Sequence, residues 1–255
     1  VIPGLMMALA FALYCLVSGY WRPEVQRDQW KGFGACLAAV RKSVWALSMP
    51  PLVLGGIYLG VFTASEAAAV GCIYALAVGA FVYRNFGLTE LWETSLETVR
   101  TTAMLFLILA AASIFGHSIT IIRLPAELVE FVTAQGLSVT GFLIAVMAVI
   151  FVLGMFLETI AIILITTPII FPVMLELSID PIWYGILLMI NLELALITPP
   201  VGMNLFVIKG IARAPLGEVI RGTMPYVMLL LLGLAIVFML PGLATWLPAV
   251  AGFGR

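Results

Sequence analysis

The segment "NLELALITPPVGMN", residues 191–204, decides how the fold of this chain is interpreted. It places a carboxylate, Glu193, beside a Thr-Pro-Pro-Val-Gly sequence inside an apolar run that is long enough to cross a membrane. A continuous helix cannot pass two adjacent prolines without losing backbone hydrogen bonds. The segment therefore predicts a helix that breaks inside a membrane span.

The chemistry of this break is set by the two prolines. Pro199 and Pro200 carry no N–H, so the carbonyls of Ala195 and Leu196 lose their i+4 donors, while Gly202 allows the backbone to turn. An unsatisfied carbonyl in hydrocarbon costs several kcal/mol. Some other group must therefore satisfy these carbonyls.

Composition assigns the chain to the membrane. The 255 residues are 64% hydrophobic and 10% charged, with a mean hydropathy of +1.20, whereas soluble domains carry about 25% charged residues. The balance of 12 Lys+Arg against 13 Asp+Glu, without a basic block, argues against nucleic acid as a partner. A single histidine, His117, and no Gly-x-Ser-x-Gly or His-Glu-x-x-His arrangement argue against an enzyme.

Apolar windows of about 17 to 22 residues predict the membrane crossings. They are 3–20, 45–61, 66–83, 101–121, a tract from 139 to 175, a tract from 182 to 208, and 224–247. Most basic residues fall in three joints between these windows, namely Arg22, Arg27, Lys31, Arg41, Lys42, Arg84, Arg100, Lys209, Arg213 and Arg221. The positive-inside rule makes these joints cytoplasmic and puts the C-terminus on the outer face. Segments 26–43 and 89–100, which mix charged and apolar residues, are expected along the membrane surface.

The tract from 139 to 175 must contribute zero or two net crossings, and parity does not choose between them. Its first apolar arm, 142–153, is about 18 Å long as a helix, which is too short for a bilayer. The return arm is expected to be interrupted at Thr166-Thr167-Pro168 and closed at Pro172. A re-entrant hairpin with a polar tip at mid-depth is favoured, and two ordinary spans remain the alternative.

The break and the hairpin tip together suggest a binding site. Freed carbonyls, with the Thr198 hydroxyl and the Asn204 amide, suit a hard cation such as Na⁺, and the helix that restarts near Met203 offers N–H groups to an anion. The alternative is an ordinary kink whose carbonyls are satisfied by Thr198 itself. Glu158 and Glu193 are the deepest carboxylates, with roles either in ion or proton handling or in pairing with a neighbouring subunit.

Two local signals fix helix starts. Thr63 and Glu66 fit the capping box, and Asp180-Pro181 combines an acidic N-cap with proline in the first turn. The first of these is expected to be structural, a cap and tight turn between spans, with a ligand role as the alternative.

Four stretches carry a family resemblance: "GVFTASEAAAVGCIYAL" (60–76), "GMFLETIAIILITTPIIFPVM" (154–174), "DPIWYGILLMINLELALITPPVGMNLFVIKGIA" (180–212) and "LGEVIRGTMPYVMLLLLGLAIVFMLPGLATWLP" (216–248). With them the chain resembles the large membrane subunit, of DctM type, of the tripartite ATP-independent periplasmic (TRAP) transporters. The family usually has Phe-Thr-Pro-Thr-Glu where this chain has Phe-Thr-Ala-Ser-Glu at 62–66, a change that leaves the cap intact.

The resemblance implies a Na⁺-driven permease of the bacterial or archaeal inner membrane that imports carboxylate-bearing organic acids, such as C4-dicarboxylates or sugar acids. It implies two partners, a periplasmic binding protein of DctP type and a small four-helix membrane subunit of DctQ type, and no cofactor other than Na⁺ as coupling ion. It also implies an all-α inverted-repeat elevator fold with re-entrant hairpins and broken helices, of which this chain holds the second half. We therefore expect half a transport site, with a non-transporting remnant or a passive channel-like subunit as alternatives.

The resemblance also assigns regions and ligands. Residues 1–138 would form scaffold helices and connecting arms, 139–208 part of the transport domain, and 209–255 a cytoplasmic joint and the final membrane helix. Na⁺ would lie at Gly154, Thr159, Thr198 and Gly202, mostly on backbone carbonyls. The full set of expected substrate and ion positions is Gly154, Glu158, Thr159, Ala195, Leu196, Thr198, Pro199, Pro200, Gly202 and Asn204.

Overall fold

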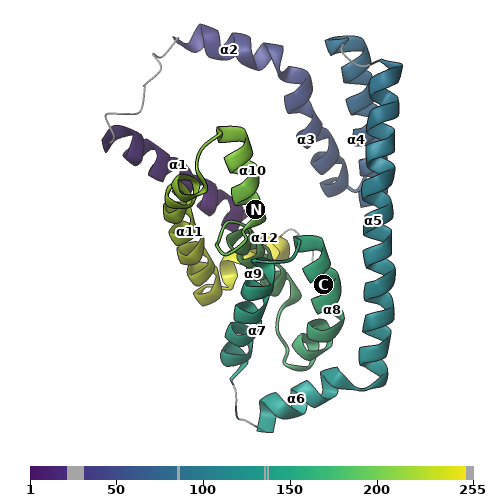
Figure 1. Ribbon diagram of the computed structural model, residues 1–255, viewed down its shortest axis with the longest axis vertical. Coiled ribbons are helices and arrows are strands. Elements are labelled where there is room, and N and C mark those ends of the chain that lie inside the picture. The colour runs from purple at the N-terminus through teal and green to yellow at the C-terminus, as the bar shows by residue number, and fades with distance from the viewer. Residues whose placement is uncertain (22–31, 85–86, 135, 137, 251–255) are drawn as a thin grey trace. The chain divides into compact units, whose positions relative to one another are not determined.

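The computed structural model describes residues 1–21, 32–84, 87–134, 136 and 138–250. Every element in these ranges is a helix (Figure 1): α1 (Ile2–Trp21), α2 (Gly32–Lys42), α3 (Val44–Tyr58), α4 (Ala64–Ala77), η1 (Val78–Tyr83), α5 (Leu88–Ile121), α6 (Leu124–Ala134), α7 (Val139–Gly154), α8 (Thr159–Glu176), α9 (Pro181–Leu196), α10 (Met203–Ala212), α11 (Leu216–Met239) and α12 (Gly242–Val250). Contacts divide the chain into two compact units, one of Val1–Pro23 with Phe106–Arg255 and the other of Glu24–Leu105. The three regions predicted from the sequence are defined by their expected roles and not by contacts, so they stay a prediction.

Within the described ranges, five helical stretches are long and apolar enough to cross a membrane: Ile2–Tyr20, Ala64–Tyr83, Leu88–Ile121, Thr159–Glu176 and Leu216–Met239. The prediction of an all-α integral membrane protein is confirmed. The elevator arrangement stays a prediction.

In the unit of Glu24–Leu105, α3 and α4 pack together as a helical pair. The predicted capping box starts α4: the Thr63 N–H donates to Glu66 Oε2 at 2.8 Å, and the Glu66 N–H donates to Thr63 Oγ1 at 3.3 Å. Gly71 lets α4 approach α3, because a Cβ there would lie 3.3 Å from the Val53 side chain. The structural role expected for this motif is therefore confirmed.

The two predicted surface segments have different outcomes. Part of the segment 26–43 forms α2, while Arg22, Arg27 and Lys31 lie outside the described residues. Residues 89–100 begin the continuous 34-residue helix α5, and their place along the membrane surface stays a prediction. This stretch contains no proline or glycine, and its Thr and Glu residues have ordinary helix propensities. Nothing therefore ends the helix before the apolar segment.

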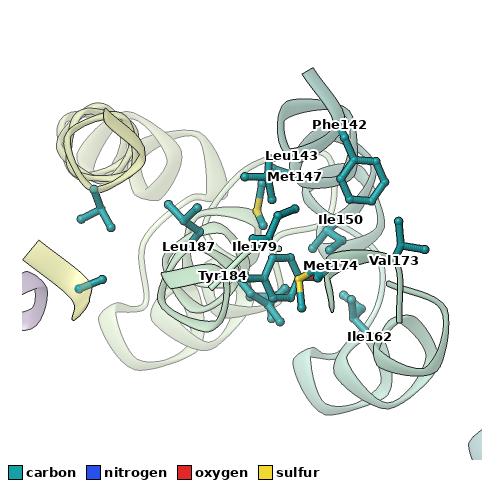
Figure 2. Packing of buried hydrophobic residues seen from close by; sticks show 14 residues of the cluster. Phe142, Leu143, Met147, Ile150, Ile162, Val173, Met174, Ile179, Tyr184 and Leu187 are labelled. Atoms are coloured by element: carbon teal, nitrogen blue, oxygen red, sulfur yellow. The ribbon is translucent and has the colours of Figure 1, made fainter. Parts of the chain in front are cut away.

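The other unit has its core where α7, α8 and α9 meet (Figure 2). Leu143, Ile150 and Leu187 are fully buried there, and Tyr184 and Ile162 pack into the same cluster. Apolar residues at three- and four-residue spacing give each helix the stripe that this packing needs. The cluster holds the hairpin α7–α8 against α9.

A second contact fixes α9 to α11. Pro241 has no N–H, so the carbonyl of Val237, four residues earlier, lacks its helical donor. The indole N–H of Trp183 donates to this carbonyl at 2.9 Å, and the Trp183 ring lies 5.8 Å from the ring of Phe238. The first turn of α9 is thus tied to the last turn of α11.

The hairpin arms are longer than expected. Helix α7 begins at Val139 with Ser138 as its N-cap, and α8 runs unbroken through Pro168 and Pro172 to Glu176. The prediction that proline interrupts and closes the return arm is wrong, because proline can occupy a helix when the loss of its hydrogen bond is tolerated by the surroundings. With 16 and 18 residues, the arms measure about 24 and 27 Å. The re-entrant path therefore stays a prediction.

Candidate functional site

The hairpin tip consists of residues 155–158, between the end of α7 and the start of α8. The turn closes on α7 through the Leu157 N–H, which donates to the Leu153 carbonyl at 2.9 Å. Glu158 is the N-cap of α8 and is half-buried, but its carboxylate makes no hydrogen bond to the first turn of the helix. Thr159, also half-buried, is the first residue of α8.

The predicted helix break lies between Leu196, the last residue of α9, and Met203, the first residue of α10. The Leu196 carbonyl faces proline at both i+3 and i+4, so it has neither helical donor. The sequence predicts that the Ala195 carbonyl is free, but the Thr198 N–H donates to it at 3.1 Å. A tighter i+3 bond has replaced the lost i+4 bond.

Thr198 also uses its side chain within the break. Its hydroxyl donates to the Leu194 carbonyl at 2.6 Å, one turn earlier in α9. This bond is the one expected of an ordinary kink, and it consumes the hydroxyl proton while leaving the oxygen lone pairs able to accept or to coordinate. Pro199 and Pro200, joined by a cis peptide bond, complete the irregular segment.

Gly202 turns the chain into α10. Its backbone is left-handed, with φ +56° and ψ +76°, where residues with a Cβ are strained. A Cβ would in addition lie 2.9 Å from the Thr198 carbonyl oxygen and 2.8 Å from the Leu205 side chain. Both the conformation and the space therefore require glycine.

The tip and the break are in direct contact. The Gly202 N–H donates to the Met155 carbonyl, with 3.3 Å between nitrogen and oxygen. Beside this bond, a Cβ on Gly154 would lie only 2.7 Å from the Cβ of Ala195. Absence of a side chain at Gly154 is what allows the tip to reach α9.

Four helix ends consequently converge (Figure 1). Helices α7 and α9 run in the same direction and end at the site, while α8 and α10 begin there. Helix C-termini present partly negative carbonyls and helix N-termini present partly positive N–H groups. One small region thus offers ligands for a cation and for an anion.

Among the predicted positions, the structure brings Gly154 against Ala195 and Gly202 against Thr198, and the bond from Gly202 to Met155 joins these two pairs. Asn204, half-buried in the first turn of α10, and Thr159 flank them. Glu193 instead lies on an exposed face of α9, and its ion-handling role stays a prediction. Among the described residues there is no group of three or more His, Cys, Asp and Glu placed to hold a metal.

Two groups near the site were not among the predicted positions. The Met155 carbonyl is a backbone atom with no signal in the residue type. Asn191, only 2% exposed, donates from its side-chain Nδ2 to the Met147 carbonyl at 2.9 Å and so joins α9 to α7. An amide within an apolar span was a signal that could have been followed.

Comparison with known proteins identifies the family. Residues 1–243 match the family described as the tripartite ATP-independent periplasmic transporter, DctM component. The C4-dicarboxylate TRAP transporter large permease protein DctM of Pseudomonas aeruginosa is 41% identical over 253 residues, which are 97% of this chain and 58% of the relative.

Relatives with other names match the same part of this chain. The isethionate TRAP transporter permease protein DctMQ of Oleidesulfovibrio alaskensis is 33% identical over 99% of this chain and 39% of its own length. The ectoine TRAP transporter large permease protein TeaC of Halomonas elongata is 32% identical, covering 98% of this chain and 58% of the relative. The chain thus spans less than two thirds of the length of these relatives, and it belongs to the DctM family of TRAP transporter large permease proteins.

Proposed function

We propose that this chain carries one part of the ion and substrate site of a Na⁺-coupled permease that imports carboxylate-bearing organic acids, such as C4-dicarboxylates or sugar acids. The observation that carries the proposal is the hydrogen bond from Gly202 to Met155, which joins the hairpin tip to the break in the α9–α10 pair. Broken helices at mid-membrane are the usual place for coupling-ion and substrate sites in secondary transporters.

Oxygen atoms at the site favour Na⁺ as the coupling ion. The Leu196 carbonyl has no helical donor, the Thr198 hydroxyl oxygen keeps its lone pairs, and the α7 C-terminus at Gly154 adds partly negative carbonyls. Na⁺ is a hard cation that takes such neutral oxygen ligands. The proposal assigns it to Gly154, Thr159, Thr198 and Gly202.

The helix N-termini favour an anionic substrate group. At α8 the nearest carboxylate is Glu158 itself, which occupies the N-cap. At α10 the N-cap is Gly202, which has no side chain, so the first N–H groups of α10 are left for a ligand. A substrate carboxylate at Met203 and Asn204 would complete this end of the helix.

The rest of the proposal rests on family membership. A small four-helix membrane subunit of DctQ type and a periplasmic binding protein of DctP type would complete a transporter in the inner membrane, with the C-terminus of this chain on the periplasmic side. Residues 139–208 would belong to the part that moves in an elevator mechanism. Since the relatives are longer, uptake is expected of the complete assembly.

Stabilisation by Na⁺ tests the proposal on the chain itself. Binding of an ion to the folded state alone adds about 1.4 kcal/mol at ten times the dissociation constant. We expect the thermal unfolding midpoint of the purified chain to rise with Na⁺ and not with K⁺ at equal ionic strength. Thr198→Ala should remove the difference. Thr167→Ala, a threonine that also donates to its own helix, should retain it.

Equal midpoints in Na⁺ and K⁺ would contradict the ion assignment. In the complete assembly, uptake that continues unchanged after the Na⁺ gradient is collapsed would favour the passive channel-like alternative. Uptake that requires the gradient would exclude that alternative.

A further inference from the structure

Asn191 is a polar side chain that the proposed site does not use. It lies in the middle of α9, only 2% exposed, among fully buried leucines. Its Nδ2 donates to the Met147 carbonyl of α7 at 2.9 Å. Because burying an amide is costly even when it is bonded, a leucine at this position would be the simpler solution for packing alone.

The bond to Met147 does not repair a defect in α7. Helix α7 runs without interruption from Val139 to Gly154, and residue 151, four positions after Met147, is a phenylalanine with an ordinary N–H. The Trp183 bond differs, since it satisfies a carbonyl that Pro241 has deprived of its donor. Asn191 therefore adds a directional link between two helices that are each complete.

A directional link is valuable here because the rest of this interface is apolar. Leu143, Ile150, Leu187 and Leu192 belong to this apolar cluster. Apolar burial is non-directional and selects the axial position of a helix less sharply than a hydrogen bond does. A single buried asparagine is known to set the register of packed helices in coiled coils. The same physical effect applies to two parallel helices in this core.

The site depends on that register. Helices α7 and α9 run in the same direction, so sliding one by a single residue moves the tip about 1.5 Å relative to the break. The contact between Gly202 and Met155 already spans 3.3 Å, close to the longest distance at which a hydrogen bond is effective. A slide of one residue would break it.

We propose that Asn191 is a positioning residue: its bond to Met147 sets the register of α7 against α9 and thereby holds the hairpin tip on the helix break. This inference deepens the proposed function in that it takes the tip and break as the site, but it makes no assumption about Na⁺. It predicts a distance, which can be measured without any ligand.

The test places spin labels on Leu157→Cys and Met203→Cys, which are 41% and 43% exposed and lie on the tip and the break. The three native cysteines are free and exposed and are replaced by serine. Dipolar broadening in Na⁺-free detergent solution reports the distance between the labels. We expect Asn191→Leu to shift the distance between the labels by about 1.5 Å, or to broaden the distribution of distances by that amount.

Asn191→Asp provides a second variant with an internal control. A protonated aspartic acid can donate to the Met147 carbonyl, whereas a carboxylate cannot, so the distance should match the parent in acid and depart from it in alkali. The carboxylates and cations on the helices around α9 are exposed; they are Glu176, Glu193, Lys209, Glu218 and Arg221. None of these groups lines the cavity of about 830 Å³ that Asn191 borders, and neither do the buried Tyr184 of α9 and the half-buried Tyr226 of α11, for which the parent chain at both pH values is the control. Glu158 lies at the tip, and the parent chain measured at both pH values accounts for it.

Thr166→Val is the matched control, because Thr166 is also buried but donates only within its own helix, to Ile162. The distance between the two labels in this variant should equal that in the parent chain. A folded Asn191→Leu chain with the parent distance, or an Asn191→Asp chain that does not respond to pH, would overturn the inference. Failure of Na⁺ to stabilise the chain would refute the ion assignment and leave this distance result standing.

Discussion

Adding one methyl group at the hairpin tip gives the most direct test of the site geometry. In Gly154→Ala the new Cβ would lie 2.7 Å from the Cβ of Ala195, whereas ordinary contacts begin at 3.4 Å. The tip must then retreat by about 0.7 Å, because both atoms are carried by helix backbone. That retreat is enough to lengthen the Gly202–Met155 hydrogen bond beyond its useful range.

The expected cost follows from overpacking, which is typically about 1–3 kcal/mol in a well-packed core. A shift of about 2–4 °C in the unfolding midpoint per kcal/mol applies to chains of this size. Gly185→Ala in α9 is the matched control, since a Cβ there meets nothing within 4 Å, and alanine is favoured over glycine in a helix by about 1 kcal/mol. We therefore expect the two alanine variants to shift the midpoint in opposite directions.

Rescue distinguishes a clash from a general loss of stability. Ala195→Gly removes the methyl group that Gly154→Ala would meet, at a cost of about 1 kcal/mol in helix propensity. The double variant should be more stable than the sum of the single effects by about 1–3 kcal/mol. Thermal unfolding of the four chains, each with and without Na⁺, measures this coupling. Additive single effects, or a Gly154→Ala chain as stable as Gly185→Ala, would refute the close approach.

Three further substitutions test individual contacts by unfolding. Gly202→Ala should destabilise the chain by about 2 kcal/mol or more, from the left-handed backbone and the close contacts, whereas Gly210→Ala, with open space around it, should not. Trp183→Phe should cost about 1–3 kcal/mol by leaving the Val237 carbonyl without its donor, and an unchanged midpoint would show that another donor replaces it. Asp180→Ala should cost about 1 kcal/mol, because two N–H groups of α9 lose their cap; amide exchange in the first turn of α9 should rise, and unchanged exchange would count against the cap.

The features that the sequence predicted correctly are those set by neighbouring residues. The capping box at Thr63 and Glu66, the cap at Asp180 and the break at Pro199 and Pro200 all depend on hydrogen-bonding groups within a few positions of one another. Such local chemistry is visible in the residue types. The assignment to the membrane also followed from the residue types, through the composition of the whole chain.

The features that it missed depend on the surroundings. Pro168 and Pro172 have the same chemistry as the prolines of the break, yet α8 passes through them. Adjacency alone does not explain the difference, because α3 also runs through an adjacent pair, Pro50 and Pro51. The break differs in Gly202, which follows the pair 199–200 and takes the left-handed turn that starts α10. The Met155 carbonyl could not be predicted at all, because its role arises only when the chain brings the tip back to α9.

The convergence of four helix ends also determines what genetics can detect in this protein. The groups that meet there are mostly main-chain carbonyls, which every residue type carries, and main-chain N–H groups, which every residue type except proline carries. A scan that replaces side chains would therefore detect Thr198, Asn191 and the positions where shape matters, which are Gly154, Gly202 and the proline pair. It would pass over the main-chain groups of Met155 and Leu196. Exchanging a single peptide bond for an ester removes an N–H and weakens the preceding carbonyl as an acceptor. Such exchanges would detect the main-chain groups of the site that side-chain substitutions leave unchanged.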